Sequence, residues 1–159
     1  MIKILTILNK KEEEFLRTPT KKVPLPLSDE HQKLIEKMKV IMKKSDGVGL
    51  AANQIGVDLQ IAIVEYQNKS YTLINPKIIK LSKKMELGEE GCLSVPGCIG
   101  VVPRAKKIVV ETFDKDGKKI KIKEKDMLAR IIQHEIDHLN GILFVDKAKE
   151  IYYSKNYAK

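Results

Sequence analysis

The sequence predicts an α+β fold, in which small mixed or antiparallel β-sheets pack around a central buried helix. Two observations favour this class. Strand-like segments cluster in the middle of the chain between two segments of helical periodicity, which argues against a doubly wound parallel sheet. The second helical segment is apolar on both sides, as expected of a helix enclosed by other elements. With 159 residues, we expect one domain over 1–159, of which 146–159 forms a short basic tail.

The composition is that of a globular protein with a basic surface. Apolar residues make up 43% of the chain, and the excess of Lys and Arg over Asp and Glu leaves a net charge of +9. Collagen-like, low-complexity and disordered classes are thereby excluded. The charge would suit nucleic acid, a ribosomal surface or an anionic membrane. The lysines are spread along the chain, however, and 5% of residues are aromatic, so a base-stacking surface is not indicated.

We expect a cytoplasmic protein of bacterial type, with a phage or organelle origin left open. The apolar run at the N-terminus is brief and passes into Lys11-Glu12-Glu13-Glu14, unlike a signal peptide. No stretch of the sequence approaches the roughly 18–20 apolar residues of a spanning helix. Neither a membrane nor DNA is therefore expected as a partner.

The first predicted helix follows a segment that contains prolines. Residues 17–27 include Pro at three positions, which favours an extended lead-in. Ser28 is a typical N-cap, and Asp29 and Glu30 suit the first helical turn. Apolar side chains then recur at helical spacing, at Leu34, Ile35, Met38, Ile41 and Met42. This pattern predicts an amphipathic helix of about four turns that ends near Lys44.

The middle of the chain predicts two β-hairpins. Leu59–Tyr66 and Tyr71–Asn75 are rich in β-forming residues and flank a short polar segment. Ile108–Phe113 and Lys118–Ile122 flank a segment with Asp and Gly, which is a stronger turn signal. Ile78–Leu81 is a candidate for a separate short strand.

The second predicted helix, Asp126–Asn140, carries the most informative motif of the chain. Gly141 follows it in the position of a C-terminal cap. The helix contains His134-Glu135-Ile136-Asp137-His138, an H-E-x-x-H motif. Residues four apart share one helical face, so both imidazoles can reach one metal ion. About 0.005 such motifs would occur by chance in this composition, and unpaired buried histidines would be costly, so a metal site is favoured over a structural role.

The third metal ligand is expected to be a cysteine. A catalytic site of this type has three protein ligands and an open position, and Glu150, the Glu that follows the motif, lies in the polar tail. Cys92 lies in Glu89–Gly97, a segment with Gly and Pro that suits a turn. A thiolate with two imidazoles suits zinc or ferrous iron. Spacing alone does not exclude Cys98, although a small buried side chain is the favoured interpretation there.

A third segment, Gly47–Gln54, contains two glycines and two alanines that let backbone or substrate approach closely. It matches neither a P-loop nor a dinucleotide-binding loop. Together with Glu90–Ser94 and Gln133–His138, it resembles the motifs G-x-G-L-A-A-x-Q, E-G-C-L-S and Q-H-E-x-D-H of the peptide deformylases, in the order of that family. The resemblance extends from the first helix to Asp146.

This resemblance implies that the protein removes the N-formyl group from the N-terminal formylmethionine of newly synthesised proteins and releases formate. Its partners are then N-formylmethionyl nascent peptides. By motif position, Cys92, His134 and His138 bind the metal. Ferrous iron (Fe2+) is the family's usual metal, and Zn2+, Ni2+ or Co2+ can occupy the same site. Glu135 is the general acid/base that assists attack of metal-bound water on the formyl carbon.

The same resemblance places further residues around the substrate. The side-chain amide of Gln54 and the backbone N–H of Leu93 are expected to bind the oxyanion. Gly49 lies where the substrate backbone passes. Val48 and Ile131 are candidates for the methionine pocket, and membership of the core is an equally good interpretation of both.

Two arginines near the motifs carry separate expectations. Arg130 is expected to border the methionine pocket and to alter the preference for residues beyond methionine. Arg104 is a candidate to pair with Glu90, and an ordinary surface arginine is nearly as good an interpretation.

Two other functions compete with deformylation. The H-E-x-x-H motif also serves endopeptidases, but their usual downstream ligand is missing here. A structural zinc on a domain that binds the ribosome or nucleic acid would need a fourth ligand and would leave Glu135 and Gln54 without a task. Relatives use a C-terminal helix to dock on the ribosome. The lysines of the tail are candidates for that contact here, namely Lys147, Lys149, Lys155 and Lys159.

Overall fold

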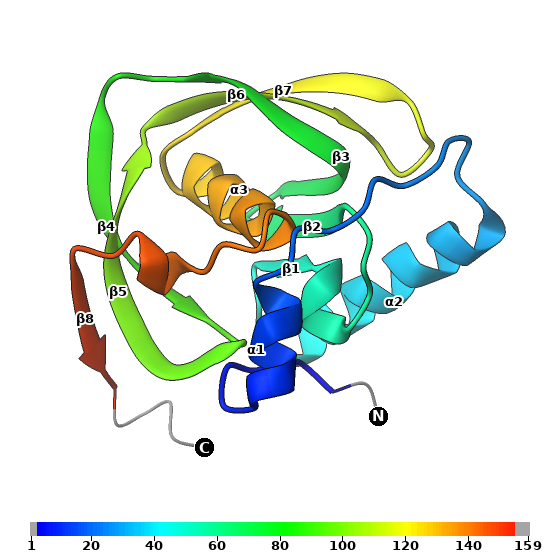
Figure 1. Cartoon of the computed structure of the whole chain (residues 1–159). Helices are drawn as coiled ribbons and strands as arrows, with labels where there is room; N and C mark the ends of the chain where they lie inside the picture. Colours follow the sequence, from blue (N-terminus) through cyan, green and yellow to red (C-terminus); the bar gives the residue numbers. More distant parts are fainter. Residues whose placement is uncertain (1–2, 155–159) are drawn as a thin grey trace.

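The computed structural model describes residues 3–154 as two antiparallel sheets arranged around one central helix (Figure 1). The helices are α1 (Lys10–Leu16), α2 (Asp29–Lys44) and α3 (Asp126–Leu139). The strands are β1 (Gly49–Ala51), β2 (Ile61–Tyr66), β3 (Lys69–Leu81), β4 (Met85–Cys92), β5 (Val95–Ala105), β6 (Lys107–Phe113), β7 (Lys119–Lys125) and β8 (Glu150–Tyr153). Two short 3-10 helices are Ala52–Ile55 and Phe144–Asp146. The predicted α+β class is confirmed.

The strands form two sheets whose described pairings are all antiparallel. The five-stranded sheet, called sheet A here, has the order β1-β2-β3-β6-β7, and the three-stranded sheet B has the order β4-β5-β8. Both predicted hairpins are present, as β2-β3 and β6-β7 in sheet A. Short segments connect β3 to β4 and β5 to β6, so sheet B continues from sheet A beside α3 (Figure 1).

The central helix α3 is held against one face of sheet A by apolar packing. Its side chains Leu128, Ile132 and Leu139 are buried in one cluster with Val110 and Ile122 of sheet A. Because removal of apolar surface from water is the dominant favourable term in folding, this contact fixes α3 in the middle of the molecule. The predicted burial of the helix is confirmed.

The opposite face of sheet A is covered by α2 over part of its width. Met38 and Met42 of α2 pack with Leu50 of β1 and Ile63 of β2, and Phe113 of β6 packs at the margin of this cluster. The amphipathic pattern of α2 therefore faces the sheet as predicted. Within residues 3–154, no helix has the length and apolarity needed to cross a membrane.

The ends of the two predicted helices are confirmed. The Ser28 hydroxyl accepts a hydrogen bond from the His31 N–H at the start of α2, and His31 Nδ1 accepts from the Ser28 N–H. Gly141 follows α3 with a φ of +73°. A Cβ at this position would overlap the carbonyl group of Arg17. Glycine is thus required there by both conformation and space.

Three segments differ from the sequence prediction. Ile78–Leu81 is not a separate strand, because β3 continues to its end through two register shifts against β6. The turn expected within Glu89–Gly97 is present but is confined to Leu93 and Ser94, because β4 extends to Cys92 and β5 begins at Val95. Helix α1 was not expected, although Asn9 before an acidic first turn is a typical helix start.

The C-terminal segment contributes a strand to sheet B. β8 pairs with β5 from Val101↔Glu150 to Cys98↔Tyr153. Lys147 forms an ion pair with Asp137 of α3 at 2.9 Å, and Lys149 is exposed. The tail residues Lys155 and Lys159 lie outside the described residues.

Candidate metal centre

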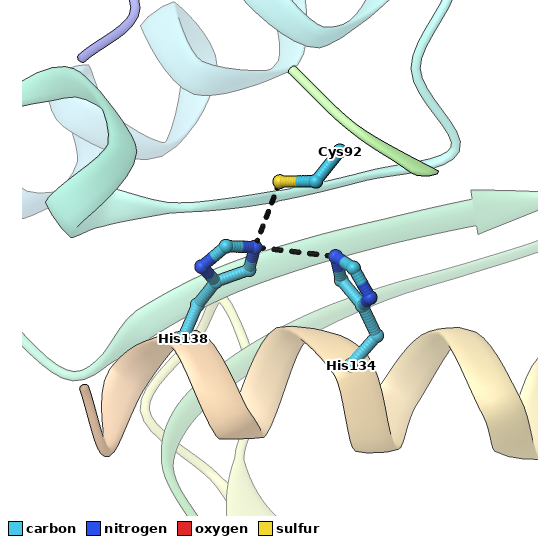
Figure 2. Close-up of side chains that lie close together, drawn as sticks. All are labelled: Cys92, His134 and His138. Carbon is cyan, nitrogen blue, oxygen red and sulfur yellow. Dashed lines mark hydrogen bonds between the residues drawn. The ribbon is translucent and has the colours of Figure 1, made fainter. Parts of the chain in front are cut away.

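Three side chains with metal-binding atoms converge between α3 and the end of β4 (Figure 2). The Sγ of Cys92 lies 3.2 Å from Nε2 of His138, which lies 3.2 Å from Nε2 of His134. The three donor atoms are all within 4.8 Å of one another. Both imidazoles project from one face of α3, as their i, i+4 spacing predicts. The structure therefore brings together the residues that sequence reasoning assigned to a metal.

The position of Cys92 depends on the hairpin between β4 and β5. Cys92 ends β4, and its Sγ accepts hydrogen bonds from the Ser94 N–H at 3.4 Å and from Gln54 Nε2 at 3.4 Å. Burial opposes ionisation of the thiol, but His138 and His134 hold the pKa of Cys92 well below its usual value. A sulfur anion, the form that binds metals, is thereby favoured at this position.

This donor set fits a divalent transition metal. One thiolate and two imidazoles suit zinc or ferrous iron, and three protein ligands leave one position open. Oε2 of Glu135 is buried beside the donors without a hydrogen-bond partner in the described residues, as expected where a further group completes a site. Cys98 instead lies on β5, in an apolar cluster with Val102 and Phe144, so the interpretation of Cys98 as a small buried side chain is confirmed.

Glu90 orients the ring of His134 from the side opposite the thiolate. Its Oε1 lies 2.7 Å from Nδ1 of His134. Arg104 donates two hydrogen bonds of 2.9 Å to this carboxylate, and Arg130 donates one of 2.8 Å. Burial works against ionisation, but His134 and Arg104 lower the pKa of Glu90 to about 2. A carboxylate on Nδ1 fixes the ring so that Nε2 faces the other two donors, and the predicted pairing of Arg104 with Glu90 is confirmed.

Glu135, between the two histidines in sequence, has a buried carboxyl group that lies against β1. Its relative exposure is 4%, and burial raises the pKa of Glu135. The backbone of Gly49 passes so close that a Cβ there would lie 2.7 Å from Cδ of Glu135. The glycine is therefore needed for space, and the carboxyl group is confined between α3 and β1.

Gln54 presents its amide nitrogen to the same centre. Its Oε1 accepts a hydrogen bond from the Ala51 N–H at 3.0 Å, and its Nε2 donates to Ser94 Oγ at 3.1 Å. These partners distinguish the two ends of the amide. The NH2 group consequently faces Cys92 and donates to both Cys92 Sγ and Ser94 Oγ, so an acceptor bound there would replace one of these two partners.

A cavity of about 430 Å³ opens beside Cys92 and His134, whereas His138 does not line it. Most of the predicted site residues line it, namely Val48, Gly49, Gln54, Cys92, Leu93, Arg130, Ile131, His134 and Glu135. Val48 is 45% exposed, whereas Ile131 is buried, so the cavity extends from the surface to the helix. Met127 also lines it. Sequence reasoning omitted Met127 from the pocket, although its place seven residues before His134 puts it on the ligand face of α3.

Arg130 borders the cavity, but its guanidinium group is already hydrogen-bonded to other residues of the protein. Besides Glu90, it donates to the carbonyls of Val102 at 2.8 Å and Glu86 at 2.7 Å. A Cβ at Gly88 would lie 2.8 Å from Cζ of Arg130, so that glycine makes room for the arginine. Arg130 thus joins α3 to sheet B at the wall of the cavity.

Comparisons with known proteins agree on one family. Residues 3–153 match the sequence model of the polypeptide deformylase family. The peptide deformylase of Dictyoglomus thermophilum is 44% identical over 143 residues, which are 90% of this chain and 92% of that protein. The crystal structure of the Thermotoga maritima peptide deformylase has a TM-score of 0.87 and 33% identity, and the match covers 94% and 99% of the two chains. A Met-Ala-Ser-bound class I type b peptide deformylase from Acinetobacter baumannii has a TM-score of 0.86 and 31% identity, with 92% and 98% covered. The chain therefore belongs to the polypeptide deformylase family and is a metal-dependent enzyme of N-terminal deformylation.

Proposed function

We propose that Cys92, His134 and His138 hold the catalytic metal, and that Glu135 and Gln54 act on the formyl group of an N-formylmethionyl chain. The observation that carries this assignment is the convergence of three donor atoms beside a buried carboxyl group without a partner. Cys92, His134 and Glu135 line the cavity, and this geometry supports hydrolysis of a small acyl group beside them.

Glu135 assists the attack of water on the formyl carbon. A divalent cation held by Cys92, His134 and His138 would lower the pKa of water at this site from about 16 toward 7. Glu135 takes the proton of the attacking water and later delivers it to the departing amine. The raised pKa of Glu135, caused by burial, suits a group that must accept and then donate a proton near neutral pH.

Two neutral donors stabilise the negative charge that develops on the formyl oxygen. Nε2 of Gln54 is one, because its amide orientation is set by Ala51 and Ser94. The backbone N–H of Leu93, in the turn after Cys92, is the other. Donors that are oriented before the reaction stabilise the transition state without a cost of reorganisation.

The cavity accounts for substrate selection. Val48, Ile131 and Met127 supply apolar surface for the methionine side chain, and Arg130 shapes the wall beside them. Gly49 lines the cavity where the substrate backbone is proposed to pass, while its missing side chain makes room for Glu135. The Acinetobacter baumannii relative binds Met-Ala-Ser, and we infer that this chain takes the same class of N-terminal sequence.

The metal in the cell is proposed to be ferrous iron. The donor set suits Fe2+ and Zn2+, and Ni2+ or Co2+ can use the same ligands. We propose further that residues 1–159 act as one catalytic domain in the cytoplasm, where nascent chains emerge from ribosomes.

One assay with three substrates tests the proposed reaction. Anaerobically purified protein is given formyl-Met-Ala-Ser, its acetyl analogue and the unblocked peptide. Formate release from the first substrate alone is the expected result. Cleavage inside the peptides would indicate an endopeptidase, and stoichiometric metal without turnover would indicate a structural site.

The two cysteines provide a matched pair for the metal assignment. Cys92→Ala is expected to lose metal and activity, because one of three ligands is removed. Cys98→Ala is expected to keep both, because Cys98 lies in the apolar cluster of sheet B. Loss of metal from the Cys98 variant alone would overturn the ligand assignment.

A further inference from the structure

A row of lysines lies on the outer face of sheet A, away from the metal centre. Residues 119, 121, 123 and 125 of β7 are all Lys and all exposed. Successive side chains of a strand alternate between faces, so these four lysines share one face. Their spacing along the strand is about 6.8 Å, twice the rise per residue.

The neighbouring strands extend this row into a two-dimensional patch. Lys107 of β6 pairs with Lys125, and Glu111 of β6 pairs with both Lys121 of β7 and Lys77 of β3. Directly paired residues lie on the same face of a sheet. We call this surface the basic face, consisting of Lys77, Lys107, Lys119, Lys121, Lys123 and Lys125.

The basic face is poorly neutralised. Glu111, with its side chain 33% exposed, lies 3.7 Å from Lys119 and 3.8 Å from Lys121, so one carboxylate is shared by two ammonium groups. The side chains of these lysines remain 64% and 53% exposed. Like charges on adjacent positions of a sheet are unfavourable. Their accumulation on one face therefore favours binding of a polyanionic partner.

The basic face is separated from the catalytic cavity by the sheet itself. Ile108, Val110 and Ile122 of the same strands point the other way and pack against α3. Helix α2 covers the outer face over β1 and β2 but packs against β6 only near Phe113. In Figure 1, β6 and β7 arch over α3 and leave their far side uncovered by any helix. A partner on this side would leave the cavity open.

We propose that the basic face docks the enzyme on the phosphate backbone of RNA. Phe113, the aromatic residue paired with Lys119 on this face, is half-buried and packs toward α2, so the exposed lysines favour phosphate contacts over base stacking, and hence binding that does not depend on sequence. A surface that inserts into membranes would add exposed apolar side chains, whereas Val109 and Phe113, on the same face of β6, are half-buried. The choice of RNA rests on the proposed function, since formyl-methionyl chains emerge from a particle rich in RNA.

The test compares two charge-matched triple variants of the full chain. The first is Lys121→Gln, Lys123→Gln and Lys125→Gln on β7. The control is Lys10→Gln, Lys11→Gln and Lys44→Gln, which removes the same charge from α1 and the C-terminal end of α2. Binding to a fluorescein-labelled RNA duplex of about 16 base pairs is measured by anisotropy over a range of KCl concentrations.

The wild type is expected to bind with a steep salt dependence. The β7 variant should lose at least about 10-fold in affinity, and the slope of log K against log salt should fall by roughly 2 to 3, since each phosphate contact contributes about 0.9. The control variant should bind nearly as the wild type does. Deformylation of free formyl-Met-Ala-Ser should be equal in all three proteins, which separates this proposal from the proposed function.

Three outcomes would overturn the proposal. The first is a wild type that does not bind RNA at low salt. The second is equal loss of affinity in both variants, which would attribute binding to net charge. The third is loss of binding by the β7 variant to vesicles of phosphatidylcholine and phosphatidylserine with unchanged binding to RNA, which would make this surface a membrane contact.

Discussion

At the scale of single residues, Gln54 offers a clean separation of catalysis from metal binding. Its Nε2 lies 3.4 Å from Cys92 Sγ as a hydrogen-bond donor, and an amide nitrogen is not a ligand for the metal. We expect Gln54→Leu to retain the metal and to lose about 100- to 1000-fold in kcat, because one donor to the oxyanion is removed. Metal analysis and formate release measure the two effects. A variant that keeps its metal and its turnover would contradict the role of Gln54.

Gly49 is a second residue at which a substitution has a specific expected effect on activity. In Gly49→Ala the new Cβ would collide with the Glu135 carboxyl group, which is enclosed and has little room to move. We expect about a 100-fold loss of kcat/KM, the effect typical of displacing a catalytic group by about 1 Å.

The neighbouring glycine provides the control for this substitution. A Cβ at Gly47 would meet its nearest atoms at 3.5 Å, an ordinary contact, so Gly47→Ala should remain active. Steady-state kinetics on formyl-Met-Ala-Ser distinguish the two variants. Equal activities would show that the collision at Gly49 is relieved without displacing Glu135.

The two cysteines show what sequence spacing can and cannot decide. The motif with His134 and His138 predicts two ligands, because four residues along a helix return to the same face. The third ligand is non-local: the segment around Cys92 favoured that residue, but spacing alone did not exclude Cys98. The hairpin places Cys92 at the end of β4 beside the two histidines of α3, whereas Cys98 is buried in sheet B.

At the scale of elements, Arg104 joins two strands to the catalytic helix. From β5 it binds Glu90 of β4 twice at 2.9 Å and Asp137 of α3 at 2.5 Å, and its side chain is almost fully buried. Truncation of the Arg104 side chain would leave the buried carboxylates of Glu90 and Asp137 without this partner. We therefore expect Arg104→Met to lower the free energy of unfolding by about 3–5 kcal/mol, measured by urea denaturation.

Arg17 supplies a matched control for this ion-pair network. It binds Glu13 at 2.9 Å and Asp146 at 3.0 Å, but its side chain is 38% exposed. Exposed pairs contribute about 0–1 kcal/mol, so Arg17→Met should change the free energy of unfolding little. Similar losses in both variants would mean that burial of the Arg104 network does not determine its contribution.

The elements also differ in how well local patterns predict them. Helix α2 was predictable because Ser28 caps it and its apolar residues keep one period. Strands β4 and β5 were not, because Gly and Pro interrupt them and both residue types normally argue against a strand. Pairing along the whole of β4, together with burial of Val95 and Val102, outweighs those local preferences.

At the scale of the whole molecule, part of the positive charge of the chain is concentrated on one surface, the basic face. Along the sequence the lysines look evenly spread, and the net charge of +9 indicates no particular surface. Antiparallel pairing of β3, β6 and β7 gathers lysines as far apart as Lys77 and Lys125 onto one face. Such a face depends on strand register, which composition and charge spacing do not reveal.

The tail shows the same dependence on long-range pairing. Sequence reasoning treated 146–159 as a basic extension, whereas β8 is an ordered strand of sheet B. Truncation after Asp146 would therefore remove a strand as well as the lysines. Substitution of Lys149 by Gln tests the charge of the tail without disturbing that pairing, since Lys149 has an exposed side chain.

The metal is expected to stabilise the whole molecule because its ligands come from two layers. Cys92 belongs to sheet B, and the two histidines belong to α3, which packs on sheet A. A ligand present at 100 times its Kd adds about 2.7 kcal/mol to the stability of the folded state. For a domain of this size that corresponds to a rise in Tm of roughly 5–10 °C.

Removal of the metal from the wild type should therefore lower Tm by this amount, as measured by calorimetry of anaerobic protein before and after chelation. Cys92→Ala should unfold at one temperature whether or not the chelator is present, because its site no longer retains the ion. Cys98→Ala should show the full chelator-dependent shift from its own baseline. If the wild type lost its metal without any change in Tm, the ion would not be linking sheet B to α3, and the ligand set would have to be reassigned.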